Sequence, residues 1–172
     1  MMKEFPRRRL HAAAGILMAI TAACSLPSLA LAATVKVTLA DHGPDAVTQN
    51  GLGMGMAGAD MAKATMEVMV DPPTVDAGKV TFEVTNASKD LVHEMIVAPL
   101  GSASKSLPYD DKNSDVDENA VHSLGEVEER DPGNAGTLTL DLKPGKYVLF
   151  CNVPGHYTAG MWTVLTVVSK SG

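Results

Sequence analysis

Residues 147–164 read Tyr147-Val-Leu-Phe-Cys151-Asn-Val-Pro-Gly-His156-Tyr-Thr-Ala-Gly-Met161-Trp-Thr-Val, and this stretch is the most informative part of the chain. One run of apolar, β-forming residues ends at Cys151, and another begins directly after Met161. The segment between them contains Pro and Gly, which is typical of a loop, and it carries His156. The sequence therefore predicts two consecutive strands joined by a loop, with three potential metal ligands at the junction.

These three residues offer a thiolate, an imidazole and a thioether, which are soft donors that select copper, especially Cu(I), over magnesium or calcium. A second imidazole is available from His93, which lies in the predicted strand 91–98. Two His, one Cys and a weak axial Met form the ligand set of a blue copper site. A lone histidine or methionine is more often a packed residue, but the order His93, Cys151, His156, Met161 at strand ends favours a metal site.

Most of the chain after residue 33 alternates between apolar and polar residues with a period of two, as half-buried strands do. Turn-forming segments such as Asp71-Pro72-Pro73 and Lys143-Pro144-Gly145 separate these runs. Short strands with such punctuation predict an all-β fold, an antiparallel β-sandwich of about seven strands. The predicted strands are 34–39, 66–70, 80–85, 91–98, 137–142, 146–150 and 162–168.

The segment from Pro144 to Met161 resembles the copper loop of the cupredoxins, the plastocyanin and azurin family of blue copper proteins. Its spacing, with four residues on each side of the loop histidine, is most similar to that of auracyanin and rusticyanin. The strand 80–84 and the Asn86-Ala87-Ser88 turn before His93 also match, so the resemblance covers about residues 64–168.

The resemblance implies a Greek-key β-sandwich with one type 1 copper, bound by His93, Cys151, His156 and, axially, Met161. It also implies that His156, on an exposed loop, is the port through which electrons enter and leave. One residue departs from the family pattern: many cupredoxins have Asn or Ser after the first ligand His, whereas this chain has Glu94.

The residues around this set predict an electron carrier rather than an enzyme. Four protein ligands leave no open position for substrate or water. Cys151 has no His beside it to reach further copper ions, as it would in a laccase-like enzyme. Two Cys in 172 residues also exclude a disulfide-dense scaffold and a four-cysteine zinc site.

Residues 1–33 are predicted to be a cleavable signal peptide. Lys3 and residues 7–9 provide positive charge, and the apolar stretch 12–23 is too short to span a bilayer comfortably. Ala30-Leu31-Ala32 has the small-residue pattern of a cleavage site. We therefore expect an exported, periplasmic protein.

Cleavage would leave Cys151 as the only cysteine and change the formal net charge from −6 to −9, because four of the 14 basic residues and one of the 20 acidic ones are lost. The mature chain is predicted to have no membrane span, although processing at Cys24 would give it a lipid anchor. We expect an N-terminal strand and Met/Gly-rich loop over residues 34–63, followed by the copper domain over residues 64–172.

The acidic balance argues against nucleic acid as a partner. Much of the negative charge lies in a predicted insertion, residues 102–136. This charge predicts attraction of a basic redox partner, for example a c-type cytochrome, although it could equally serve only solubility. We expect the protein to be a monomer.

A different function remains open, because residues 54–69 are rich in methionine. Thioethers bind Cu(I), so these residues together with His42 could form a second site in a copper chaperone or storage protein. The alternative is that two of them, Met66 and Met69, lie on opposite faces of one strand and the rest decorate a loop. The methionines are Met54, Met56, Met61, Met66 and Met69.

Overall fold

The computed structural model describes residues 32–43, 60–101 and 106–170. The chain divides into two units, residues 1–30 and 31–172, and the described residues all belong to the second. They form strands and one short 3-10 helix, η2 (Met61–Lys63), with no α-helix among them. None of the helical structure described is long and apolar enough to cross a membrane.

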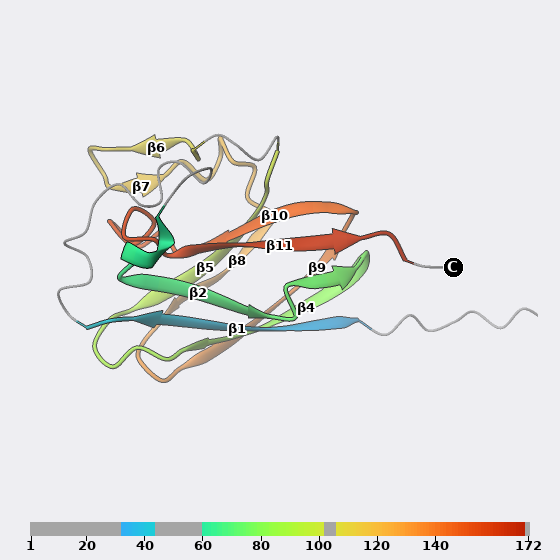
Figure 1. The fold of residues 1–172 in the computed structure, drawn as a ribbon, viewed down its shortest axis with the longest axis horizontal. Coiled ribbons are helices and arrows are strands. Elements are labelled where there is room, and N and C mark those ends of the chain that lie inside the picture. The colour runs from blue at the N-terminus through green and yellow to red at the C-terminus, as the bar shows by residue number, and fades with distance from the viewer. Residues whose placement is uncertain (1–31, 44–59, 102–105, 171–172) are drawn as a thin grey trace, which may run out of the picture. The chain divides into compact units, whose positions relative to one another are not determined.

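The first sheet has the strand order β2-β1-β4-β9. Strand β1 runs parallel to β4, and the other neighbours in this sheet are antiparallel. The parallel pairing lets β1 lie centrally between two strands that follow it in the sequence (Figure 1). The bounds are β1 (Ala33–Asp41), β2 (Met66–Asp71), β4 (Gly78–Asn86) and β9 (Ala135–Leu142).

The second sheet has the order β3-β11-β10-β5-β8, and a separate hairpin is formed by β6 and β7. Strand β10 lies at the centre and pairs antiparallel with both β11 and β5, which brings the ends of β5 and β10 together. The bounds are β3 (Thr74–Asp76), β5 (His93–Pro99), β6 (Tyr109–Asp110), β7 (Asp115–Val116), β8 (Gly125–Arg130), β10 (Gly145–Phe150) and β11 (Trp162–Val168).

The predicted all-β sandwich is confirmed, and each of the seven predicted strands is present within a few residues of its expected bounds. One expectation was wrong: the pairing is mixed rather than purely antiparallel, because β1 runs parallel to β4 and β3 runs parallel to β11. The acidic insertion contributes β6, β7 and the edge strand β8, three strands that were not predicted.

The main core lies between the two sheets and follows from the alternation in the sequence. Val35, Val37 and Leu39 of β1 are at most 1% exposed, and their polar neighbours point the other way. Strand β4 also contributes to this core, and its Phe82 is fully buried. Burying one such side chain contributes about 1.5–3 kcal/mol, so this inward face provides much of the stability that holds the sheets together.

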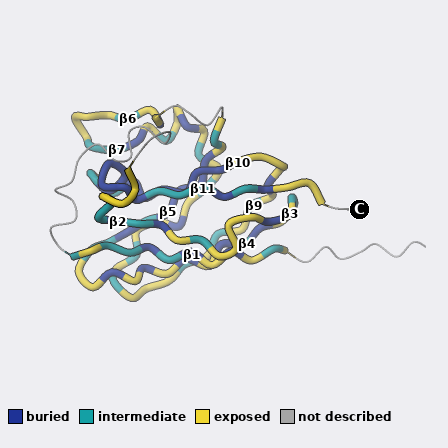
Figure 2. The backbone as a smooth tube through the Cα atoms, in the orientation of Figure 1, coloured by how far each residue is buried: buried dark blue, intermediate teal, exposed yellow. Residues whose placement is uncertain are grey.

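A second apolar cluster covers the outer face of the second sheet. Residues 95–98 of β5 and 147–150 of β10 are therefore buried on both faces of the sheet (Figure 2). The insertion supplies Leu107, Val116 and Val121 to this cluster. They pack with Phe150 of β10 and with Tyr157 of the loop that follows it. The insertion is thus an integral layer next to that loop.

Replacement of Phe82 by Ala should lower the free energy of unfolding by about 3–5 kcal/mol, because it removes a fully buried ring and leaves a cavity. Chemical denaturation of the metal-free protein measures this loss. The neighbouring Glu83 is exposed, so Glu83→Ala is the matched control and should change stability by less than about 0.5 kcal/mol. Equal losses in the two variants would contradict the assigned core face.

Candidate metal centre

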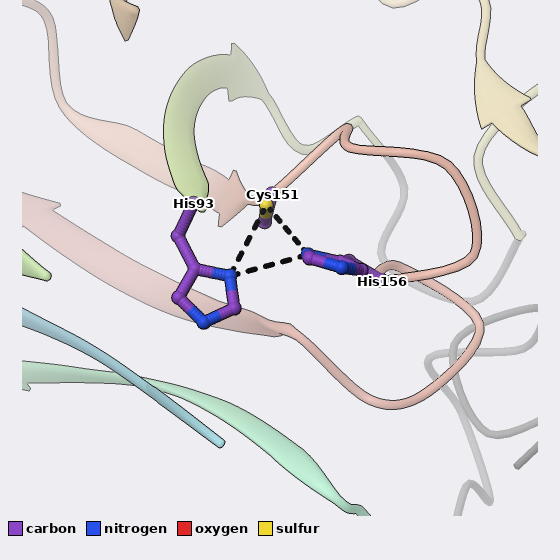
Figure 3. A group of neighbouring side chains, drawn as sticks. All are labelled: His93, Cys151 and His156. Carbon is purple, nitrogen blue, oxygen red and sulfur yellow. Dashed lines mark hydrogen bonds between the residues drawn. The ribbon is translucent and has the colours of Figure 1, made fainter. Parts of the chain in front are cut away.

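His93, Cys151 and His156 converge at one end of the second sheet (Figure 3). His93 is the first residue of β5, Cys151 directly follows β10, and His156 lies in the turns after it. The Nδ1 atoms of His93 and His156 are 3.2 Å apart. Cys151 Sγ lies 3.4 Å from His156 Nδ1 and 4.0 Å from His93 Nδ1. Three potential ligand atoms thus face one another within 4.8 Å.

The fourth predicted residue, Met161, is fully buried and lies beside this group through its backbone. The N–H of Cys151 donates to the carbonyl of Met161 at 3.1 Å, and the N–H of Met161 donates to the carbonyl of His156 at 3.1 Å. These bonds close the loop from 151 to 161 so that its two ends meet. The four residues predicted from the sequence are therefore neighbours in the fold.

Two glycines make the loop possible. Gly155 and Gly160 have φ angles of +85° and +101°, which residues other than Gly rarely adopt. A Cβ at Gly160 would also lie only 2.6 Å from the Cβ of Ala64. The same part of the loop is bonded to the segment just before β2 of the first sheet, because the N–H of Thr65 donates to the carbonyl of Ala159 at 3.1 Å. The loop is thus held from both sheets.

Burial makes the unliganded group electrically neutral. It raises the pKa of the Cys151 thiol to about 12 and lowers the pKa of His156 to about 4, where the neighbouring His93 contributes further. It also lowers the pKa of His93, against the opposing effect of Asp41. A buried thiol between two neutral imidazoles fits a soft, thiophilic metal ion, whose binding would release the thiol proton.

A sequence model of copper-binding proteins of the plastocyanin/azurin family matches residues 52–168, well over half of the chain. This chain belongs to that family. The cupredoxin resemblance found in the sequence is thereby confirmed, and copper is the cofactor that the donor set fits. No curated protein sequence matches the chain.

Solved structures similar to this cupredoxin include auracyanins and rusticyanin. A dithionite-reduced auracyanin from Roseiflexus castenholzii has 20% identity and a TM-score of 0.49, with 80% of this chain and 98% of that one covered. Rusticyanin from Thiobacillus ferrooxidans has 20% identity and a TM-score of 0.46, with 78% and 77% covered. Auracyanin A from Chloroflexus aurantiacus has 20% identity and a TM-score of 0.46, with 78% and 98% covered.

Glu94, the residue that departs from the family pattern, connects the two chain segments of the centre. Its carboxylate accepts a hydrogen bond from the N–H of Asn152 at 3.1 Å, and its own N–H points at Cys151 Sγ at 3.5 Å. Burial raises the pKa of Glu94 to about 7, and the negative charges of Glu118, Glu126 and Glu129 add to this. The longer acidic side chain therefore braces the ligand loops in this cupredoxin.

Asn152 attaches the copper loop to the insertion. Its side chain accepts from the N–H of Val116 at 2.6 Å and donates to the carbonyl of Val116 and to Glu118, each at 3.0 Å. A second tie runs from the N–H of Gly155 to the carbonyl of Ser114 at 2.8 Å. The acidic insertion, predicted only as a charged surface, thus supports the loop directly.

The loop is less exposed than the family resemblance implies. His156 is 3% exposed and Tyr157 is 1% exposed, because Tyr157 packs under the insertion. Pro154 is the exposed residue of the loop beside them. Tyr157 thus does not contribute to the surface of this loop, since its phenol ring is part of the outer apolar cluster.

Asp41 was not identified from the sequence, although it contacts a predicted ligand. Its Oδ2 lies 3.3 Å from Nε2 of His93, and both side chains are nearly inaccessible, at 4% and 0% exposed. A signal was present in the alternation of β1: Asp41 continues the odd-numbered, inward-facing series of Val35, Val37 and Leu39. A charged residue in such a series indicates a buried polar partner.

The remaining candidates lie apart from the centre or outside the described residues. His42 and His122 are exposed, and neither belongs to the His93 group. Three of the other candidate methionines are described: Met66 is buried, Met69 is 45% exposed and Met61 is 39% exposed. Met54 and Met56 lie outside the described residues.

Replacement of Asn152 by Ala should lower the free energy of unfolding of the metal-free protein by about 1–3 kcal/mol, because both backbone groups of buried Val116 lose their partner. Urea denaturation measures the loss. Asn119→Ala is the matched control, since Asn119 lies in the same insertion and is exposed. A loss no larger than that of the control would mean that the insertion does not support the loop.

Proposed function

We propose that this chain is a type 1 (blue) copper protein that carries single electrons between redox partners, with His93, Cys151, His156 and Met161 as the copper ligands. The observation that carries the proposal is the buried convergence of two imidazole nitrogens and one thiol sulfur within 4.8 Å, closed off by the backbone of Met161. Two His, one Cys and an axial Met form the ligand set of blue copper sites.

Bound copper would supply a Cu(I)/Cu(II) couple, and the protein would keep its surroundings constant during the change of oxidation state. His93 begins β5 and Cys151 directly follows the paired strand β10, and the loop that carries His156 and Met161 is hydrogen-bonded to the rest of the sandwich. The N–H of Glu94 points at Cys151 Sγ and would stabilise the thiolate charge. A rigid, buried donor set with four ligands suits electron transfer and offers no position for a substrate, so we do not propose an enzyme.

The proposed localisation rests on the amino-terminal sequence. Residues 1–33 combine positive charge, a short apolar stretch and an Ala-Leu-Ala motif, which are the parts of a cleavable export signal. Within the exported chain we propose an N-terminal segment, residues 34–63, and the copper domain, residues 64–172. Strand β1 of the first segment would then complete the first sheet of the domain by pairing with β2 and β4.

Replacement of Cys151 by Ser should abolish the intense visible absorption band at about 600 nm, since that band arises from charge transfer between a thiolate and copper in sites of this ligand set. Absorption spectroscopy of the copper-loaded variants measures it. Met161→Leu is the contrasting variant: it should keep the band and copper binding while changing the reduction potential, because an axial thioether tunes the potential. A Cys151→Ser protein that stays blue would contradict the ligand assignment.

We propose a basic protein, such as a c-type cytochrome, as one redox partner. The edge strand β8 exposes Glu126, Glu128 and Glu129, and two of these lie close enough to raise the pKa of Glu94 beside the centre. Negative charge at this distance from the copper ligands would attract a basic partner before contact. Nothing in the described residues favours the alternative of a copper chaperone or storage protein.

The rate of association with a basic c-type cytochrome should fall as ionic strength rises, because the Debye length shrinks from about 10 Å at 0.1 M to about 3 Å at 1 M. Stopped-flow electron transfer measures it. Glu128→Lys should slow association at low salt, whereas the control Glu83→Lys, at an exposed position on the opposite sheet, should have little effect. A rate independent of salt would exclude electrostatic steering.

A further inference from the structure

We propose that Asp41 is a positioning residue for the metal centre: its carboxylate holds the His93 ring with Nε2 protonated and Nδ1 free to bind the metal. This inference rests on the proposed function, because it takes His93 as a ligand. It adds a residue that lies outside the part of the chain matched by the family, which begins at residue 52.

The contact joins two buried side chains from different sheets. Asp41 is the last residue of β1 in the first sheet, and His93 is the first residue of β5 in the second. Asp41 Oδ2 and His93 Nε2 are 3.3 Å apart, with the carboxylate 4% exposed and the imidazole completely buried. Two polar groups shielded from water at this distance form a hydrogen bond that little solvent can weaken.

The carboxylate is itself held in place by neighbours other than His93. Its Oδ1 accepts a hydrogen bond from the N–H of Gly43 at 2.7 Å, and the Ser88 hydroxyl also bonds to Asp41. A carboxyl group is ionised at neutral pH, and an ionised carboxylate can only accept hydrogen bonds. The group facing His93 is therefore an acceptor that its other hydrogen bonds hold in place.

This acceptor determines which ring nitrogen of His93 carries the proton. A neutral imidazole has one N–H, and the other nitrogen has a free lone pair. With the proton on Nε2 and directed at Asp41, the lone pair is on Nδ1. Nδ1 is the atom that lies 3.2 Å from His156 Nδ1 and 4.0 Å from Cys151 Sγ. The hydrogen bond and the metal-binding orientation therefore require the same tautomer.

A carboxylate behind a ligand histidine also affects the metal. It makes the imidazole a stronger donor and adds negative charge near the ion, and both effects favour the higher oxidation state. The loss of such outer partners lowers metal affinity about 10- to 100-fold in other proteins. We expect a loss of that size for Cu(II) and a smaller one for Cu(I), which corresponds to a higher reduction potential in the absence of the Asp41 charge.

The first experiment uses the full chain without metal and with 15N-labelled histidine. NMR should show that His93 carries its proton on Nε2 in the unchanged protein, whereas Asp41→Ala should populate both tautomers. A purely structural role would lower stability without changing the tautomer. The proposal fails if His93 is protonated on Nδ1 in the unchanged protein, or if its tautomer is the same in Asp41→Ala.

The second experiment compares copper-loaded proteins by direct measurement of the reduction potential and of Cu(II) affinity. Asp41→Asn keeps nearly the same shape and removes the charge, so it should raise the potential and weaken Cu(II) binding while the visible band remains. Asp71→Asn is the matched control, because Asp71 also ends a strand of the first sheet but is exposed. Equal potentials in Asp41→Asn and the control would overturn the proposal.

The two sets of results separate this inference from the proposed function. If the unchanged protein lacks the thiolate band, or Cys151→Ser retains it, the proposed ligand set fails whatever Asp41 does. If the band behaves as expected but the Asp41 variants leave both the tautomer and the potential unchanged, only the role of Asp41 fails.

Discussion

The structure depends on the antiparallel pairing of β5 with β10. That pairing places the beginning of one strand beside the end of the other, so His93 and Cys151 meet although 57 positions of sequence lie between them. A thiol and two imidazoles, buried within 4.8 Å of one another, have good geometry for a soft metal ion. The sandwich, the closed loop and the outer cluster all serve to keep these groups at the same place.

Most of the fold could be predicted from the sequence, because the half-buried strands have clear alternation. The strands that were missed are short or lack an apolar pattern. Strand β3 has only Val75 buried, and β8 buries Val127 among charged neighbours. Parallel pairing could not be predicted either, since alternation tells which face of a strand is buried but not which strand lies beside it.

The donor residues could also be predicted, because three of the four lie close together in sequence with a distinctive order. The residues that support them could not. Glu94 appeared only as a departure from a pattern, and its bond to Asn152 depends on two segments that tertiary structure brings together. To predict the role of Asp41, one would have to recognise that it lies on the inward face of its strand and also know that it faces His93. Local patterns thus indicate the ligands, and long-range packing determines their surroundings.

The acidic side chains of β8 affect whether the protein self-associates. As the outermost strand of its sheet, β8 has backbone groups on one side that no neighbouring strand of the sheet uses. A strand from another molecule can form hydrogen bonds with such an edge and extend the sheet. A second copy aligned there would bring its own Glu126, Glu128 and Glu129 against the same three carboxylates. The charge therefore protects an exposed sheet edge from self-assembly at high protein concentration.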